Sequence, residues 1–490
     1  MNIMLINPKY ERYTRSLCPP LGILSIGTYL ESNGHKVKVL NRAVKATDIE
    51  KEFDSFKPDI IGCSFLSVMP FNDGIMISKA AKKRNILVVW GGPFVTSVPK
   101  LVLDLPYVDL ISMGEGEETW LELANTYKSG DIYSIRGIAF KEGERIVITP
   151  ERPFTDLSIL PNINYELIDI EKTFEKRYDY DRCFAMYLSK GCTGHCTFCY
   201  NTDFHHNCRR QRPVKQFIEE AKYMKEKHGI NAIMFSDELF CKDKRNLREV
   251  CNAIIDSGLD LKWGCMSKIG ICDREDYQLM YDAGCRWIEF GIESGAKTVL
   301  KRMKKGMDVD RVPYEIACCQ EIGIVTLCYI IVGFPDETES ELRETCKLLQ
   351  KIKSTRVVCS YFNPLPGSEI FNTLVEEGRF APPDTLRAYI NPPIFYSPKP
   401  NLSNVSSKDL KVFRSTLLIN SFFQKQFATS QKQKFSLAKS DIKAAIINVK
   451  KDTVLATVKQ FFISGYEFLD LFLYAKLFPK TKKKYELNNL

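Results

Sequence analysis

The sequence contains no stretch of about 18 uncharged apolar residues, so we expect no helix that spans a membrane. It also has no tandem repeat and no low-complexity tract. Residues 1–8 lack the basic region, the apolar stretch and the small-residue cleavage site of a signal peptide. The 490 residues are 44% hydrophobic and 26% charged. This composition excludes a wholly disordered or fibrous protein and predicts two or three globular domains.

Most of the chain has little excess of charge of either sign. Residues 401–490 hold 16 of the 69 basic residues and 6 of the 60 acidic residues, so the first 400 residues are close to neutral. The 17 cysteines lack the regular spacing of a small secreted disulfide scaffold. We therefore expect a reducing, cytoplasmic location in which many cysteines act as small buried hydrophobic residues.

Residues 1–135 alternate short apolar runs with amphipathic stretches, which is typical of an α/β, doubly wound (Rossmann-like) domain. Strands are expected at 3–6, 37–40, 59–65, 86–90 and 109–112, and helices at 21–31, 74–83 and 117–127. Ligands bind such sheets beyond the carboxyl ends of the strands. This sequence places there Ser64, Gly91, Gly92, Gly114 and Glu117. One such glycine could be only a turn, but several coincident strand ends favour a site for a large ligand.

Residues 136–182 are predicted to form a hairpin at 137–150 and then a surface linker with little periodicity. A second strand–helix alternation fills residues 183–395. Its strands are expected at 184–188, 232–235, 261–265, 287–290, 325–332 and 357–362, and its helices at 214–227, 244–257, 274–282 and 339–353. Six units are fewer than the eight of a closed barrel, so we expect a partial (β/α)6 barrel. Residues 396–490 are predicted to form a basic, helical C-terminal domain.

Three cysteines, Cys192, Cys196 and Cys199, follow the first barrel strand in a C-x3-C-x2-C pattern. Three thiolates on so short a loop can hold three irons of a 4Fe–4S cluster and leave the fourth iron open. Zinc is the alternative, but a structural zinc needs four ligands, and His195 would have to fold back within the same loop. Three structural cysteines fit poorly with a polar, glycine-containing loop.

This motif at the end of the first strand of a βα barrel resembles the signature of the radical S-adenosylmethionine (SAM) superfamily. The doubly wound domain ahead of it resembles a cobalamin-binding domain. Residues 1–370 together look like the cobalamin-dependent radical SAM enzymes, which include class B methyltransferases and the anaerobic magnesium-protoporphyrin ester cyclase. The resemblance implies three cofactors, namely a 4Fe–4S cluster, SAM and cobalamin.

The resemblance also assigns roles to side chains at the carboxyl ends of the barrel strands. The implied SAM contacts are Phe198 near the adenine, Ser236, Asp237 and Glu238 at the amino group, Lys268 at the carboxylate and Glu293 as a further polar contact. Loops 333–338 and 364–368 match family loops near the adenine and the mouth of the site. Judged without the family, these acids would be solvated residues at the top of a barrel. Their shared location at strand ends is the reason to place them in a site.

The cobalamin-binding domain departs from the family pattern in three places. If cobalamin binds, its contacts are expected at Ser64, Gly91, Gly92, Gly114 and Glu117. The D-x-H-x-x-G motif is absent from residues 1–130, where the only histidine is His35. Asn41-Arg42 stands where relatives often have Asp, and Phe94 stands where they often have His. The alternative is a degenerate domain that no longer binds cobalamin.

We expect an oxygen-sensitive enzyme that cleaves SAM to a 5′-deoxyadenosyl radical and methylates an unactivated carbon. The alternatives are radical cyclisation or rearrangement without net methyl transfer, and a non-catalytic protein that binds a cluster or cobalamin. The resemblance implies a small-molecule, lipid or peptide substrate and an external electron donor of the flavodoxin or ferredoxin type. Fold does not choose among these substrates.

For two groups of basic residues, the sequence allows both a structural and a functional role. Arg209, Arg210 and Arg212 form either a solvated turn or an anchor for a substrate phosphate or carboxylate. The tail mixes Phe and Lys at helical spacing, most clearly at 454–478, and is either a helical cap on the barrel or a peripheral membrane contact. No nucleic-acid partner is expected, because the basic residues are isolated among apolar ones.

Overall fold

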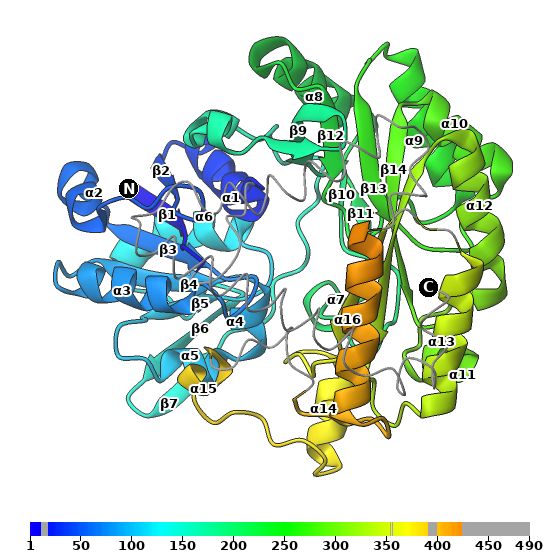
Figure 1. The fold of residues 1–490 in the computed structure, drawn as a ribbon. Coiled ribbons are helices and arrows are strands. Elements are labelled where there is room, and N and C mark those ends of the chain that lie inside the picture. Colours follow the sequence, from blue (N-terminus) through cyan, green and yellow to red (C-terminus); the bar gives the residue numbers. More distant parts are fainter. Residues whose placement is uncertain (11–17, 353, 355, 391–398, 424–490) are drawn as a thin grey trace, which may run out of the picture. The chain divides into compact units, whose positions relative to one another are not determined.

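The structure is a computed structural model that describes residues 1–10, 18–352, 354, 356–390 and 399–423 (Figure 1). The chain divides into two compact units. Unit 1 comprises residues 1–175, 199–220 and the segment that begins at 365. Unit 2 comprises residues 176–198, 221–364 and the described residues from 399 onwards. The possible membrane contact at 454–478 lies outside the described residues.

Unit 1 is built on a seven-stranded sheet with the order β2-β1-β3-β4-β5-β6-β7. The strands are β1 (Asn2–Asn7), β2 (Lys36–Asn41), β3 (Ile60–Ser64), β4 (Leu87–Gly91), β5 (Leu110–Ser112), β6 (Ile138–Glu142) and β7 (Arg145–Ile148). β1 to β5 pair in parallel, and β6 and β7 add an antiparallel hairpin to the edge. The predicted doubly wound sheet and the predicted hairpin are therefore confirmed.

The helices of this unit are α1 (Leu21–Ser32), α2 (Ile49–Phe56), α3 (Phe71–Lys82), α4 (Pro93–Ser97), α5 (Pro99–Leu103) and α6 (Glu117–Thr126). The predictions for α1, α3 and α6 are confirmed, and α2 was missed. A local signal for α2 exists, because the Asp48 side chain accepts the Lys51 N–H at its N-terminus while Ile49 and Phe53 are buried. Helices α4 and α5 are single turns that begin at proline, too short to show a period.

The segment 151–175 has no long helix or strand, but it is not confined to the surface. Leu157, Leu160, Ile163 and Tyr165 are buried, and the Tyr165 hydroxyl donates to Glu220 at 2.8 Å. The prediction of a surface linker was wrong here. Isolated apolar residues can anchor an irregular segment without any period, so the sequence pattern gave no sign of their burial.

Unit 2 is built on a sheet with the order β16-β15-β14-β13-β12-β9-β8. Its strands are β8 (Glu175–Arg177), β9 (Tyr180–Met186), β12 (Ala232–Phe235), β13 (Lys262–Ser267), β14 (Cys285–Glu293), β15 (Val325–Val332) and β16 (Arg356–Tyr361). The six strands from β9 to β16 pair in parallel. The predicted partial barrel is confirmed.

The helices after the cysteine loop are α7 (Asn201–Phe204), α8 (Val214–His228), α9 (Lys244–Asp256), α10 (Arg274–Asp282), α11 (Lys297–Arg302), α12 (Val312–Ile322), α13 (Glu339–Lys351), α14 (Glu369–Glu376), α15 (Leu386–Ile390) and α16 (Ser407–Phe423). Helices α9, α10, α12 and α13 lie along one side of the curved sheet of unit 2 (Figure 1). Of the helices that the structure describes, none is both long enough and apolar enough to cross a membrane.

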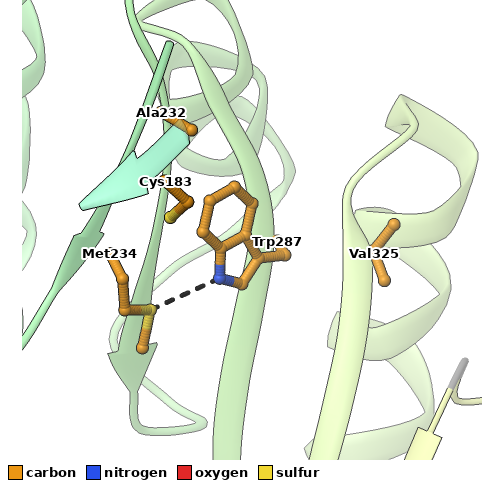
Figure 2. Close-up of a cluster of buried hydrophobic side chains, with 5 residues drawn as sticks. All are labelled: Cys183, Ala232, Met234, Trp287 and Val325. Carbon is orange, nitrogen blue, oxygen red and sulfur yellow. Dashed lines mark hydrogen bonds between the residues drawn. The ribbon is translucent and has the colours of Figure 1, made fainter. Parts of the chain in front are cut away.

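A layer of buried side chains fills the sheet of unit 2 near the amino ends of its strands. Figure 2 shows Trp287 among Cys183, Ala232, Met234 and Val325, with its indole N–H directed at the Met234 sulfur at 3.4 Å. A Cβ atom at position 264 would lie 2.0 Å from the Trp287 ring, so only glycine fits there. This packed layer leaves the opposite, carboxyl end of the strands for a site.

The edge strand β16 is covered by α16. The Arg414 Nε–H donates to the Cys359 carbonyl at 2.9 Å, and the guanidinium lies over the Tyr361 ring. Leu410 and Phe413 are fully buried. Covering an edge strand in this way satisfies backbone groups that would otherwise be exposed for pairing with another chain.

Candidate active site

The chain enters the cysteine loop through Leu188 and Ser189, and a buried carboxylate fixes both residues. Asp237, directly after β12, accepts the Leu188 N–H at 3.0 Å and the Ser189 N–H at 2.6 Å, and the Ser189 hydroxyl donates to it as well. Asp237 is completely buried. Since backbone donors reach both of its oxygens, the geometry gives Asp237 the task of holding the entrance to the loop.

The neighbours of Asp237 tie the same loop to β12. The Ser236 N–H donates to the Met186 carbonyl at 2.8 Å. The Glu238 carboxylate accepts the Gly191 N–H at 3.0 Å, one residue before the first cysteine of the motif. The structure therefore brings the predicted Ser-Asp-Glu run directly against the start of the cysteine loop.

The cysteines of the motif differ from most others in the chain. Of the 17 cysteines, 12 are buried, whereas Cys192, Cys196 and Cys199 are half-exposed. Gly194 lies between two of them, because a Cβ atom there would be 3.4 Å from the Cys192 sulfur and 3.8 Å from the Cys196 sulfur. The Gly194 N–H also donates to the Cys192 sulfur at 3.3 Å. A backbone N–H aimed at a sulfur fits a thiolate ligand.

The two metal alternatives make different demands on this loop. A zinc ion needs all its ligands about 2.0–2.3 Å from one point. In the part of the chain that the structure describes, no three His, Cys, Asp or Glu side chains converge in that way. A 4Fe–4S cluster binds each thiolate to a different iron, so its sulfur ligands stand apart. Three thiolates supply one ligand to each of three irons but leave a structural zinc one ligand short, so the donor set of this loop fits the cluster better than a single ion.

Thr197, between the last two cysteines, is held by the end of α11 (Lys297–Arg302). Its N–H donates to the Met303 carbonyl at 3.0 Å, and its hydroxyl donates to the Arg302 carbonyl at 3.4 Å. Both carbonyls lie at the C-terminal end of α11, a helix of six residues that the sequence did not predict. The half-buried Phe198 follows Thr197 directly.

The same end of α11 carries Lys305, which the sequence reasoning missed. Lys305 Nζ lies 2.7 Å from Glu293 Oε1 at the end of β14. Burial raises the pKa of the Cys196 thiol, Lys305 and Lys268 lower it, and Glu293 and Cys192 raise it. Cys196 therefore lies among two lysines and a glutamate, and only Lys305 of these three was not predicted.

Glu293 has a left-handed backbone, with φ of 65°. A non-glycine residue in this region carries strain, of about 1–3 kcal/mol, that the surroundings must offset. A Cβ atom at Gly291 would lie 2.5 Å from Glu293 Oε1 and 2.8 Å from Lys305 Nζ, so glycine at 291 makes room for the pair. Strained backbone beside a cleared space is typical of a functional site.

Lys268 is positioned by a buried network behind β13. Its ammonium lies next to Gly306, since a Cβ atom there would be 3.3 Å from Lys268 Nζ. Two residues after Lys268, the Gly270 N–H donates to Glu315 at 3.0 Å. Glu315 is completely buried and also accepts the Tyr277 hydroxyl at 2.7 Å and the Arg311 Nε–H at 2.8 Å. The loop that presents Lys268 is therefore rigidly anchored.

In unit 1, packing within the fold accounts for some of the predicted cobalamin contacts, whereas others are open to a ligand. Gly92 has φ of 100°, and a Cβ atom there would lie 2.7 Å from the Phe65 carbonyl oxygen. Gly91 packs against the Ser112 carbonyl, at 3.2 Å from a Cβ position. Tight packing within the fold is therefore enough to require glycine at 92. Ser64 is half-buried at the end of β3.

In contrast to Gly92, the glycine in the loop after β5 is not packed against other residues. Gly114 has φ of 67°, and no atom lies within 4 Å of the position of a Cβ. This open backbone offers the kind of close approach that a large ligand needs. Glu117 is buried and accepts the Ser25 hydroxyl at 2.5 Å, so it holds α1 against the start of α6. Of the five predicted contacts, Gly114 fits a bulky cofactor most directly.

The residues that depart from the family pattern have partners of their own. Arg42 is buried and donates from Nε and an Nη atom to Asp73, at 2.9 and 2.8 Å. Phe94 packs edge-on against Phe71 and Tyr389. A buried ion pair and an aromatic cluster therefore occupy the positions where relatives often have Asp and His.

Two arginines that follow the cysteine loop, Arg210 and Arg212, form ion pairs with carboxylates of unit 1. Arg210 pairs with Glu115, lies over the Phe154 ring and donates to the Thr155 carbonyl at 2.8 Å. Arg212 is buried and pairs with Glu220 at 2.6 Å. Neither the solvated turn nor a substrate anchor describes these two residues. They are structural, because their charges are already matched inside unit 1.

Comparison with known proteins agrees with the two-unit architecture. Residues 186–349 match the model of the radical SAM superfamily, and residues 13–124 match the model of the B12 binding domain. An uncharacterized methyltransferase of Pyrococcus horikoshii is 28% identical over 76% of this chain and 82% of its own length. The anaerobic magnesium-protoporphyrin IX monomethyl ester cyclase of Rubrivivax gelatinosus is 24% identical over 76% and 70%.

Among solved structures, the radical SAM methyltransferase TsrM from Kitasatospora setae, with cobalamin and a 4Fe–4S cluster bound, has a similar fold. The TM-score is 0.64 at 18% identity, over 77% of this chain and 78% of that one. The radical SAM domain predicted from the cysteine triplet and the B12 binding domain predicted from the doubly wound sheet are confirmed by the two family models.

Proposed function

Since this chain carries a radical SAM domain and a B12 binding domain, we propose that it transfers a methyl group from SAM to an unactivated carbon of its substrate. When bound, the cofactors supply an electron to the SAM sulfonium and a carrier for the methyl group. The residues of the chain bind SAM in one pose, orient the substrate and exclude water.

The observation that carries this proposal is the arrangement of charge around the cysteine loop. The methionine part of SAM is a zwitterion with an ammonium and a carboxylate. Carboxylates after β12 lie against one side of the loop, at Gly191, and two lysines lie near Cys196. Charge-assisted hydrogen bonds to both ends of the zwitterion would fix its sulfur.

We assign individual roles on this basis. Cys192, Cys196 and Cys199 hold the cluster. Glu238 takes the SAM ammonium, because Asp237 already holds Leu188 and Ser189. Lys268 and Lys305 serve the SAM carboxylate, Glu293 orients Lys305, and Phe198 lies at the adenine. Ser236 holds β12 to the loop. In the B12 binding domain, Ser64, Gly91, Gly92, Gly114 and Glu117 line the edge that receives cobalamin.

The test is SAM turnover by protein purified and reconstituted without oxygen, with dithionite and cobalamin. We expect 5′-deoxyadenosine and S-adenosylhomocysteine by mass spectrometry. The Cys192→Ala variant should form neither, whereas Cys208→Ala, which removes an exposed cysteine outside the triplet, should match the wild type. If an intact cluster with added cobalamin and candidate substrates produces neither compound, the proposal fails.

Radical cyclisation without methyl transfer is the second candidate, because a relative with 24% identity carries the name of a cyclase. Its signature would be 5′-deoxyadenosine without S-adenosylhomocysteine. For either reaction we propose a small-molecule, lipid or peptide substrate and an electron donor of the flavodoxin or ferredoxin type. The 17 cysteines, which lack the spacing of a disulfide scaffold, support a reducing, cytoplasmic site of action, and the cluster implies sensitivity to oxygen.

A further inference from the structure

The cysteine loop is hydrogen-bonded to the C-terminal end of α11. Thr197 donates its N–H to the Met303 carbonyl and its hydroxyl to the Arg302 carbonyl. Thr197 is buried and stands between Cys196 and Cys199. Any shift of this end of α11 is therefore transmitted to the backbone between two of the three cysteines. What holds α11 in place decides the geometry of the loop.

Helix α11 ends in a tight reversal that delivers Lys305 to the site. The Lys305 N–H donates to the Leu300 carbonyl and the Lys304 N–H to the Lys301 carbonyl, both at 3.0 Å. Lys304 is left-handed, with φ of 49°. This is the Schellman arrangement, which glycine usually completes. A lysine in its place carries strain, so the reversal depends on its surroundings.

Helix α11 is joined to α13 through the Glu341 carboxylate. Arg302 donates from its two Nη atoms to the two oxygens of Glu341, each at 2.9 Å. Thr298, four residues earlier on α11, donates its hydroxyl to the same carboxylate. Burial raises the pKa of Glu341, but hydrogen bonds from Arg302, Thr298 and Thr338 outweigh it and bring the pKa to about 2. Glu341 therefore stays ionised under all ordinary conditions.

The same face of α13 also holds the loop that carries Glu293. Thr345, one turn after Glu341, accepts the Gly295 N–H at 2.9 Å and contacts the Ser294 hydroxyl at 3.1 Å. Gly295 is pressed against α13, because a Cβ atom there would lie 2.6 Å from the Thr345 Cα. Both partners of the Lys305–Glu293 pair are therefore placed by one helix.

We propose that Arg302 and Glu341 are positioning residues that set the cysteine loop and Lys305 in the geometry needed to bind SAM. This inference rests on the proposed function and names a pair that touches no cofactor. The pair is not simply a device for stability, since Arg302 Nε is buried without a hydrogen-bond partner among the described residues. Although the Arg302 side chain as a whole is partly exposed, leaving its buried Nε–H unsatisfied is a costly way to join two helices.

The test uses the full chain, reconstituted without oxygen, and compares Arg302→Lys and Glu341→Gln with the wild type. The matched control is Arg248→Lys, because Arg248 binds the buried Asp276 at 2.7 Å between α9 and α10 in the same unit. Three properties are measured: iron and sulfide per chain, the melting temperature, and the Kd for SAM from the change it causes in the electron paramagnetic resonance spectrum of the reduced cluster.

We expect iron and sulfide to match the wild type in all variants. The Kd for SAM should rise at least tenfold in Glu341→Gln and by a smaller factor in Arg302→Lys, which keeps the charge but loses the two-pronged contact. Arg248→Lys should leave the Kd unchanged. A Kd within twofold of the wild type in Arg302→Lys and Glu341→Gln overturns the inference.

An equal loss of melting temperature and cluster in all three variants also overturns it, because the pair would then be merely structural. If Glu341→Gln does not fold, Arg302→Lys alone decides. If the wild-type protein assembles no cluster, or if its cluster does not respond to SAM, the proposed function itself fails. That outcome differs from a failure of this inference, in which the wild type responds to SAM and the variants respond equally well.

Discussion

Lys305 Nζ lies 2.7 Å from Glu293 Oε1, and their side chains are only 12% and 9% exposed. The lysine comes from the reversal after α11 and the glutamate from the strained end of β14. The Glu293 carboxylate fixes the direction of the Lys305 ammonium, and both groups are largely shielded from water. Beside Cys196, such a group is well suited to receive a second, exchangeable carboxylate.

Replacing Lys305 should weaken SAM binding without loss of the cluster. In Lys305→Met, one charge-assisted hydrogen bond to the SAM carboxylate disappears, which costs about 1.5–3 kcal/mol, or about a tenfold to hundredfold rise in Kd. Isothermal titration under anaerobic conditions measures this directly. Lys301→Met, at an exposed position on α11, should bind SAM like the wild type. Equal Kd values for the two variants would show that Lys305 has no part in binding.

Asp237 should matter for the fold of the cysteine loop before any cofactor is present. In Asp237→Asn, an amide NH2 faces a backbone N–H of Leu188 or Ser189, so a buried donor loses its acceptor. We expect a loss of about 2–4 kcal/mol of stability and a lower iron content after reconstitution. Thermal unfolding of the apo protein and iron analysis test this. The exposed Asp256→Asn is the control, and an unchanged melting temperature in Asp237→Asn would refute the structural role.

Glu337 should make the stability of unit 2 depend on pH. Burial raises its pKa from the ordinary 4.5 to about 7, although the Gly333 N–H donates to it at 2.6 Å. The folded protein therefore keeps this proton up to about pH 7, whereas the unfolded chain releases it near pH 4.5. The contribution of Glu337 to stability is therefore fully present below pH 4.5, falls as the pH rises to about 7 and then levels off.

The variant Glu337→Gln keeps an acceptor for Gly333 but carries no charge. Relative to the wild type it should gain about 3 kcal/mol between pH 4.5 and pH 8, because it avoids the ionised buried carboxylate. Melting temperatures at a series of pH values measure the difference. Glu339→Gln, at a more exposed position, should show no such trend. Parallel pH profiles for Glu337→Gln and the wild type would argue against a shifted pKa.

Two glycines of the B12 binding domain should respond differently to alanine. Gly92→Ala places a Cβ 2.7 Å from the Phe65 carbonyl oxygen, so we expect strong destabilisation, of several kcal/mol. Gly114→Ala meets no atom within 4 Å and carries only the strain of a positive φ, about 1–2 kcal/mol. Gly114→Ala should therefore fold yet bind cobalamin more weakly, as measured by absorbance after gel filtration. Full cobalamin content in that variant would remove Gly114 from the binding edge.

The sequence by itself determined the elements with a regular period and the features that are local in the chain. The strands at 232–235 and 325–332 and the helix at 274–282 agree with β12, β15 and α10 to the residue. The cysteine triplet was readable because its three ligands lie on one short loop. Helix α11 was missed because six residues are too few for a period to show.

Only the tertiary structure decided what the acidic and basic residues do. Lys305 and Cys196 are far apart in the sequence, and nothing near Lys305 marks it as different from Lys301 or Lys304. From the sequence, Arg210 and Arg212 fit either a solvated turn or an anchor for a substrate anion, yet each meets an internal carboxylate. Asp237 and Glu238 are adjacent in the sequence but have different partners. Asp237 accepts the backbone N–H groups of Leu188 and Ser189, whereas Glu238 accepts that of Gly191. Local patterns follow from local periodicity, whereas the partner of a charge depends on which distant segments the fold brings within hydrogen-bond distance.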